Sequence, residues 1–134
     1  MQCSLQNEDS GFSSDTELWR RIPPDKYTFD DNLGRLRPKS YAFTDSDDSP
    51  MSVTVAEFYL NSGLTLEDYF DRFKEDRYGL ASITVGLIKE LNLELELDRH
   101  DDDPGHAVVI GKKSRGIRRR MAEESVWVVK PDST

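Results

Sequence analysis

The segment from Tyr78 to Gly111 has the densest apolar content in the chain, and it constrains the fold more than any other segment. Its first part, residues 80–85, is rich in β-branched side chains and predicts a strand. Thr84 stands as an N-cap for a short helix over residues 85–91, in which apolar side chains recur on one side. The start of the segment therefore predicts a strand that runs directly into a helix.

The second part of the segment predicts an antiparallel hairpin. Leucine alternates with glutamate from Leu93 to Leu97, and this period of two is typical of a strand with one buried face. Residues 106–111, HAVVIG, make a second and more apolar strand. The polar connection between the two strands carries Pro104-Gly105, which is a turn signal.

The chain of 134 residues is long enough for one domain with a core that needs no metal or disulfide. Its single cysteine, Cys3, excludes an intrachain disulfide and favours a reducing cytoplasm. No apolar run approaches the roughly 20 residues of a membrane-spanning helix, so we expect a cytoplasmic protein with no membrane contact. The polar residues 1–16 predict a disordered tail, and residues 17–131 predict a single α+β domain.

The segments outside the centre add further strands. Residues 17–22 alternate in apolar character and end at Pro23-Pro24, which predicts a short strand. Residues 41–43 and 53–55 are both extended in character and predict a second hairpin, in which one pairs with the other. A last strand is expected over residues 125–129.

The clearest helix begins at Thr65, where Asp68 three residues later resembles a capping box. An apolar stripe at helical spacing follows, formed by Leu66, Tyr69, Phe70 and Phe73. The basic and then acidic segment after Lys112 predicts a loop that leads into another helix. Together the elements predict an α+β fold, a mainly antiparallel sheet with two or three packed helices.

The connection from His100 to His106 collects imidazoles and carboxylates, groups that bind divalent metals or transfer protons. Its spacing matches no helical two-histidine zinc pattern, and no cysteine lies nearby. A polar turn explains the aspartates equally well, and His106 at the start of a strand can bond a backbone carbonyl. We therefore expect no metal, no cofactor and no catalytic residue in this connection.

A basic block follows the second strand of the hairpin, with no acid among its cations. Its members are Lys112, Lys113, Arg115, Arg118, Arg119 and Arg120. The spacing of a phosphate-binding loop is absent, because Gly105 lies too far before Lys112. The formal net charge of −8 also disfavours general affinity for nucleic acid. The block is interpreted as a solvated or self-paired surface, as a contact for a protein partner or, less favoured, as a nucleic-acid or nucleotide site.

Several short segments are similar to those of a group of small bacterial proteins without an established activity. They are LWRRI (18–22), RPKSYAF (37–43), SV (52–53), GHAVVIG (105–111) and WVVKP (127–131). The resemblance implies a bacterial origin and directs attention to polar residues within apolar segments. With the His/Asp connection, these give one possible polar site: Arg20, Arg37, Ser40, Asp102 and His106. Arg20 and Arg21 beside Trp19, with Arg35 and Arg37 further along the chain, are alternatively an anion site, although a structural ion pair with a carboxylate is the favoured interpretation.

No catalytic motif has the spacing that its chemistry requires, whereas positive and negative charges are sharply segregated along the chain. Segregated charge steers one protein onto another. The preferred function is therefore a non-enzymatic accessory or protein-interaction subunit of a bacterial cytoplasmic assembly, with another protein as its partner. The alternative is a nucleotide- or nucleic-acid-processing enzyme or binding protein that uses the His/Asp connection and the basic block.

Overall fold

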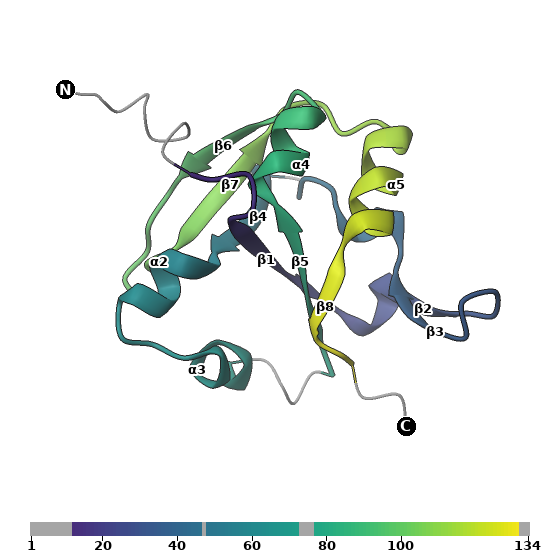
Figure 1. The fold of residues 1–134 in the computed structure, drawn as a ribbon, viewed down its shortest axis with the longest axis horizontal. Helices are drawn as coiled ribbons and strands as arrows, with labels where there is room; N and C mark the ends of the chain where they lie inside the picture. The colour runs from purple at the N-terminus through teal and green to yellow at the C-terminus, as the bar shows by residue number, and fades with distance from the viewer. Residues whose placement is uncertain (1–11, 47, 73–76, 132–134) are drawn as a thin grey trace.

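The computed structural model describes residues 12–46, 48–72 and 77–131. These residues form an antiparallel sheet of six strands, a separate sheet of two strands and four α-helices (Figure 1). The predicted α+β class is confirmed. The described residues form four α-helices, whereas two or three were expected from the sequence.

The elements have the following bounds in chain order. The strands are β1 (Glu17–Ile22), β2 (Tyr27–Asp30), β3 (Arg35–Pro38), β4 (Met51–Val55), β5 (Gly79–Thr84), β6 (Glu94–Leu97), β7 (His106–Ile110) and β8 (Val126–Val129). The α-helices are α2 (Ala56–Asn61), α3 (Leu66–Asp71), α4 (Val85–Glu90) and α5 (Arg115–Glu124). Two short 3-10 helices are η1 (Pro24–Lys26) and η2 (Ser40–Ala42). The large sheet has the order β6–β7–β4–β1–β5–β8, and β2 pairs only with β3.

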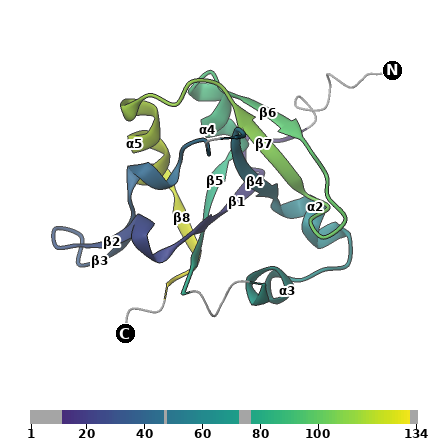
Figure 2. The same ribbon diagram turned by 180° about the vertical axis from the view of Figure 1, so that it is seen from behind.

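The central strand β1 divides the core into two parts, because its side chains alternate between the faces of the sheet. Leu18 and Ile22 are fully buried in the larger part, together with side chains of α4, α5 and η2. Trp19 is buried on the other face, against the rings of Tyr59 from α2 and Tyr69 from α3. In both views, α4 and α5 lie at the opposite end of the molecule from α3 (Figures 1 and 2).

Local sequence signals produce the elements that they predict. The β6–β7 hairpin pairs Leu95 with Val109, as the leucine alternation requires. The Thr84 hydroxyl accepts a hydrogen bond from the first turn of α4. Thr65 and Asp68 form the reciprocal capping box at the start of α3.

The apolar stripe of α3 is only partly buried. Tyr69 is its buried member, while Leu66 and Phe70 are half-buried against the smaller core. Phe73, the fourth expected member, lies outside the described residues. The hold of α3 on the sheet therefore depends chiefly on Tyr69.

The predicted hairpin between residues 41–43 and 53–55 is wrong. Residues 40–42 form η2, and β4 pairs with β1 and β7 instead. The carbonyls of Ala42 and Thr44 accept hydrogen bonds from the Arg20 guanidinium, so they need no partner strand. Hydrogen bonds from the distant Arg20 side chain thus replace the backbone pairing of the predicted hairpin.

Residues 12–16, the last five of the expected tail, pack against the domain. The carbonyls of Ser14 and Thr16 accept hydrogen bonds from the first backbone N–H groups of α4, at Gly86 and Val85. These N–H groups have no partner within the helix, so the preceding chain satisfies them. Phe12 packs against Phe58 of α2. Residues 1–11 lie outside the described residues.

The helix α2 was not expected from the sequence. It follows β4 without a loop, and its buried residues Ala56 and Tyr59 pack in the smaller core. The backbone N–H of Val55 donates to the Gly105 carbonyl, which continues the β4–β7 register up to the start of α2. In the part of the chain that the structure describes, no helix is long and apolar enough to cross a bilayer.

Candidate functional site

A cavity of about 590 Å³ opens between the β2–β3 hairpin and α5, and we call it the hairpin groove. Hairpin residues line one side and α5 the other, and β8 contributes as well. The lining residues include Leu33, Arg35, Arg37, Ser40, Arg119 and Trp127. In both views the hairpin extends away from the large sheet (Figures 1 and 2).

Local chemistry and one long-range hydrogen bond position the hairpin. The Asp30 carboxylate accepts backbone hydrogen bonds from Asn32 and Leu33 and so forms the turn. Gly34 has a φ of 70°, a left-handed conformation that glycine adopts without steric cost. The Trp127 indole N–H donates to the Leu36 carbonyl at 3.0 Å. This last contact fastens the hairpin to β8, so the groove has a fixed wall.

The five residues of the possible polar site lie in three different parts of the structure. Arg37 and Ser40 line the hairpin groove. Arg20 and His106 instead line a second cavity, of about 230 Å³. Asp102 is exposed and faces Arg72, at 3.7 Å between Oδ2 and Nη2. The five residues therefore do not form one site.

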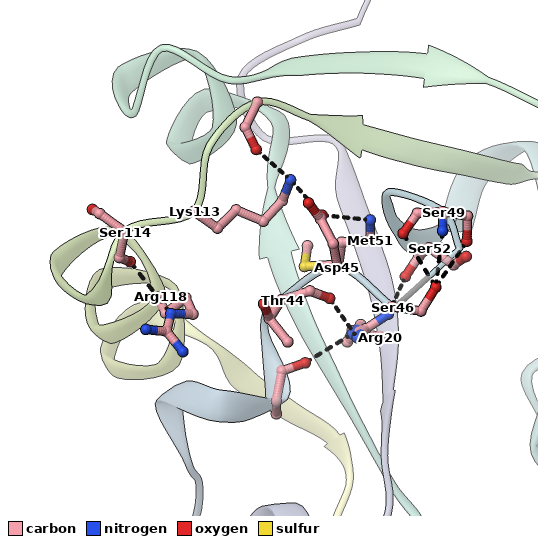
Figure 3. Close-up of polar contacts among 12 residues, drawn as sticks. Arg20, Thr44, Asp45, Ser46, Ser49, Met51, Ser52, Lys113, Ser114 and Arg118 are labelled. Atoms are coloured by element: carbon pink, nitrogen blue, oxygen red, sulfur yellow. Dashed lines mark hydrogen bonds and ion pairs between the residues drawn. The ribbon is translucent and has the colours of Figure 1, made fainter.

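Arg20 does not have the carboxylate partner expected from the sequence. Its guanidinium donates to the carbonyls of Ser52 at 2.7 Å, Ala42 at 3.0 Å and Thr44 at 3.3 Å (Figure 3). Burial, with a smaller effect from the charge of Arg21, lowers the pKa of Arg20 to about 10. Arg20 is still charged at neutral pH, and it joins β1 to the chain on both sides of the 44–52 loop.

Arg37 does form an ion pair, with Asp30 across its own hairpin. The Nε–Oδ2 distance is 2.7 Å. The hydrogen bond from Arg37 and the backbone N–H of Leu33 both hold the pKa of Asp30 below its ordinary value. The Arg37 charge is thus largely compensated within the hairpin.

The basic block separates into paired and unpaired cations. Lys113 contacts Asp45 and the Gly111 carbonyl, each at 2.7 Å, and its side chain is 2% exposed (Figure 3). Arg118 donates to the Ser114 carbonyl at 3.5 Å. Arg120 contacts the carboxylates of both Glu90 and Glu124, and these hydrogen bonds raise its pKa. Within the basic block, the exposed cations without an ion pair to a described residue are Lys112, Arg115 and Arg119.

Replacing Asp45 with alanine is expected to lower the free energy of unfolding by about 2–3 kcal/mol. The substitution leaves the buried Lys113 ammonium with one carbonyl partner, and breaking a fully buried pair costs roughly 3–5 kcal/mol. The half-exposed position of Asp45 admits water and reduces this cost. Urea unfolding measures the change.

Two comparison variants sharpen this measurement. Adding Lys113→Met to Asp45→Ala should recover the part of the loss that comes from the buried charge, whereas the Met51 N–H still lacks its Asp45 acceptor. Asp48→Ala removes an exposed carboxylate from the same loop and should cost less than about 0.5 kcal/mol. Equal effects of Asp45→Ala and Asp48→Ala would contradict a structural role for this ion pair.

The His/Asp connection brings together three side chains, of which the sequence identified two as candidate ligands. Asp98 Oδ2 lies 3.3 Å from His100 Nε2 and 3.3 Å from His106 Nδ1. The two imidazole rings are stacked, with centroids 4.1 Å apart. Asp98 was missed because it directly follows β6 and is separated from the aspartate run by Arg99 and His100. The signal was present, since the alternation that faces Glu94 and Glu96 outward extends to Asp98.

Asp103 has a structural role that sequence patterning did not reveal. It is 5% exposed, and its carboxylate accepts hydrogen bonds from the Thr54 hydroxyl at 2.6 Å and the Gly105 N–H at 3.3 Å. The Thr54 and Tyr69 hydroxyls are 2.8 Å apart, and burial raises the pKa of Tyr69. This buried network fixes the β6–β7 connection to β4 and α3.

Comparison with known proteins finds no family model, no curated protein and no solved structure that matches this chain. The resemblance to small bacterial proteins therefore stays a prediction.

Proposed function

We propose that this chain is a non-enzymatic accessory protein that binds an acidic segment of another protein in the hairpin groove. The observation that carries the proposal is the groove itself, a cavity of about 590 Å³ with guanidinium groups on both walls and an indole between them. An extended segment with a carboxylate and an apolar side chain has the chemistry to fill it.

Unpaired positive charge is available on both sides of the groove. Arg35 on the hairpin and Arg119 on α5 are exposed, and neither has an ion pair with a described residue. Arginine binds carboxylates through two parallel hydrogen bonds, which also fixes their orientation. Lys112 and Arg115, exposed near the start of α5, extend the positive surface.

Exposed apolar side chains accompany these charges. Phe29 is 57% exposed and Leu33 is 54% exposed, both on the hairpin that projects from the body of the protein. Tyr41, in η2, is 57% exposed. Of the three, only Leu33 lines the groove, where Trp127 is the aromatic residue. Arginines together with an aromatic and an aliphatic side chain are the composition that favours a protein partner.

Charge favours a protein over a nucleic acid in this groove. Asp30 and Glu123 also line it, so its positive positions at Arg35 and Arg119 are separated by negative ones, an arrangement that fits single carboxylates better than a phosphate backbone with a charge on every nucleotide. Two cations of the basic block, Lys113 and Arg120, already have carboxylate partners. With a net charge of −8, the chain as a whole also repels polyanions.

The proposal is tested by capturing the partner and then measuring its association. A photo-reactive amino acid at position 33 should cross-link an acidic protein in cells, which mass spectrometry identifies. With that protein purified, Arg119→Glu should slow association by about tenfold at low salt, because a charge at the edge of an interface acts mainly on the association rate. Surface plasmon resonance measures the rate.

Lys89→Glu is the matched control, since Lys89 is an exposed helical cation outside the groove lining. It makes the same change in net charge and should alter the rate less than about twofold. Equal slowing by both variants would contradict a specific role for the groove. A nuclease-sensitive adduct at position 33 would support the nucleic-acid alternative instead.

A further inference from the structure

A second feature of the fold lies in the connection between β6 and β7, beside α2 in both views (Figures 1 and 2). Asp98 directly follows β6, His106 begins β7, and His100 lies in the loop between them. One ligand-type atom from each residue lies within 4.8 Å of the others. We call these three residues the two-histidine cluster.

The backbone, rather than the cluster itself, holds these residues in place. The N–H of Asp98 donates to the His106 carbonyl at 2.9 Å, which continues the β6–β7 register. His100 and Asp103 bond each other through both backbone groups, and Asp103 is anchored by Thr54. The positions of the three residues therefore do not depend on the contacts among their side chains.

The two distances from Asp98 to the histidine nitrogens fit a small metal ion. Zinc bonds to imidazole nitrogen and carboxylate oxygen at about 2.0–2.2 Å, so two ligands of a tetrahedral ion lie roughly 3.3–3.5 Å apart. Asp98 Oδ2 is 3.3 Å from a nitrogen of each histidine. The Asp98 carbonyl oxygen, 2.9 Å from His106 Nδ1, adds a fourth possible ligand atom at the same place.

We propose, against the expectation from sequence spacing that this connection holds no metal, that the two-histidine cluster binds one divalent transition metal through Asp98 Oδ2, His100 Nε2 and His106 Nδ1. In the metal-free chain, His106 Nδ1 donates its proton to the Asp98 carbonyl, and the metal replaces this proton. The His100 ring turns out of its stack so that its lone pair faces the ion. Its side chain is 48% exposed, so the packing leaves it free to turn.

Charge around the cluster favours a dication. Asp101 is exposed in the same loop and adds negative potential, whereas the charge of Asp102 is partly offset by Arg72, 3.7 Å away. Arg99, the neighbouring cation, lies over the Phe58 ring and forms no ion pair with the described carboxylates. Two imidazoles select zinc, nickel or copper over magnesium and calcium, which prefer oxygen ligands.

Zinc titration by calorimetry tests the site. We expect one zinc ion per chain in a Cys3→Ser background, which removes the one thiol that competes for zinc. Magnesium at millimolar concentration should not displace it. Nitrogen chemical shifts give an independent signature, because the chain has only two histidines, and His100 Nε2 and His106 Nδ1 should be the nitrogens that shift.

Substitutions decide whether the cluster is the site. His100→Ala and Asp98→Asn should each weaken zinc binding at least about tenfold. Asp101→Asn removes a charge from the same loop, outside the cluster, and should change affinity less than about twofold. Circular dichroism checks that each variant is folded, and the exposed position of His100 makes His100→Ala decisive if Asp98→Asn unfolds.

Three results would overturn the proposal. One is the absence of saturable zinc binding tighter than about 1 mM. Another is zinc affinity that His100→Ala leaves unchanged. The third is equal weakening by Asp98→Asn and Asp101→Asn, which would mean that zinc is held by diffuse negative charge alone.

Discussion

Replacing Phe43 with alanine is expected to lower the free energy of unfolding by about 3–5 kcal/mol, a large fraction of the stability of a domain this size. Phe43 has no exposed surface and packs in the larger core, directly after η2. Removing its ring leaves a cavity that neighbouring strands and helices are too rigid to fill. Urea unfolding, with the slope checked for constancy, measures the loss.

Tyr41→Ala is the control for this variant, since both residues are aromatic and lie two positions apart. Tyr41 is 57% exposed, and the Lys26 ammonium lies 5.4 Å from its ring centroid. Its loss should cost less than about 1 kcal/mol. Similar costs for the two substitutions would mean that η2 does not direct Phe43 into the core.

Replacing Arg20 with methionine is expected to cost about 3 kcal/mol. The substitution keeps an unbranched side chain but leaves the carbonyls of Ala42, Thr44 and Ser52 without their donor. An unsatisfied buried carbonyl costs roughly 1–3 kcal/mol, and water entering from the adjoining cavity reduces the sum. Equilibrium unfolding in urea again gives the value.

The variant Arg20→Lys tests whether the role of Arg20 depends on its positive charge or on the shape of its guanidinium group. Lysine keeps the positive charge, but its compact ammonium lacks the planar fork that spans three carbonyls, so we expect a loss of about 2 kcal/mol. Arg35→Met, at an exposed arginine of β3, should cost less than about 0.5 kcal/mol. If Arg20→Lys is as stable as the native chain, charge alone explains the role of Arg20.

These two predictions concern residues whose roles the sequence did not reveal. The RPKSYAF segment reads as extended, yet it contains η2 and directs Phe43 into the core. Arg20 reads as half of an ion pair, yet it binds backbone carbonyls. In both cases the deciding contacts come from residues more than 20 positions away in the chain.

In the candidate sites too, the sequence identified single residues, and the tertiary structure decided which of them lie together. The sequence identified Arg37 and Arg119 separately, and only the packing of the β2–β3 hairpin near α5 places them on one groove. The sequence also identified His100 and His106 as groups with ligand chemistry. Asp98 joins them because the β6–β7 register sets it opposite His106.

The sequence by itself determined the elements whose signals act within a few residues. Alternating leucines made β6, the Thr84 hydroxyl began α4, and the Thr65–Asp68 box began α3. The tertiary structure alone decided which polar groups meet, such as Arg20 with Ser52, 32 residues apart, and Trp127 with Leu36, 91 residues apart. The physical reason is that a cap or an alternation depends on local backbone geometry, whereas a polar partner depends on strand order and register.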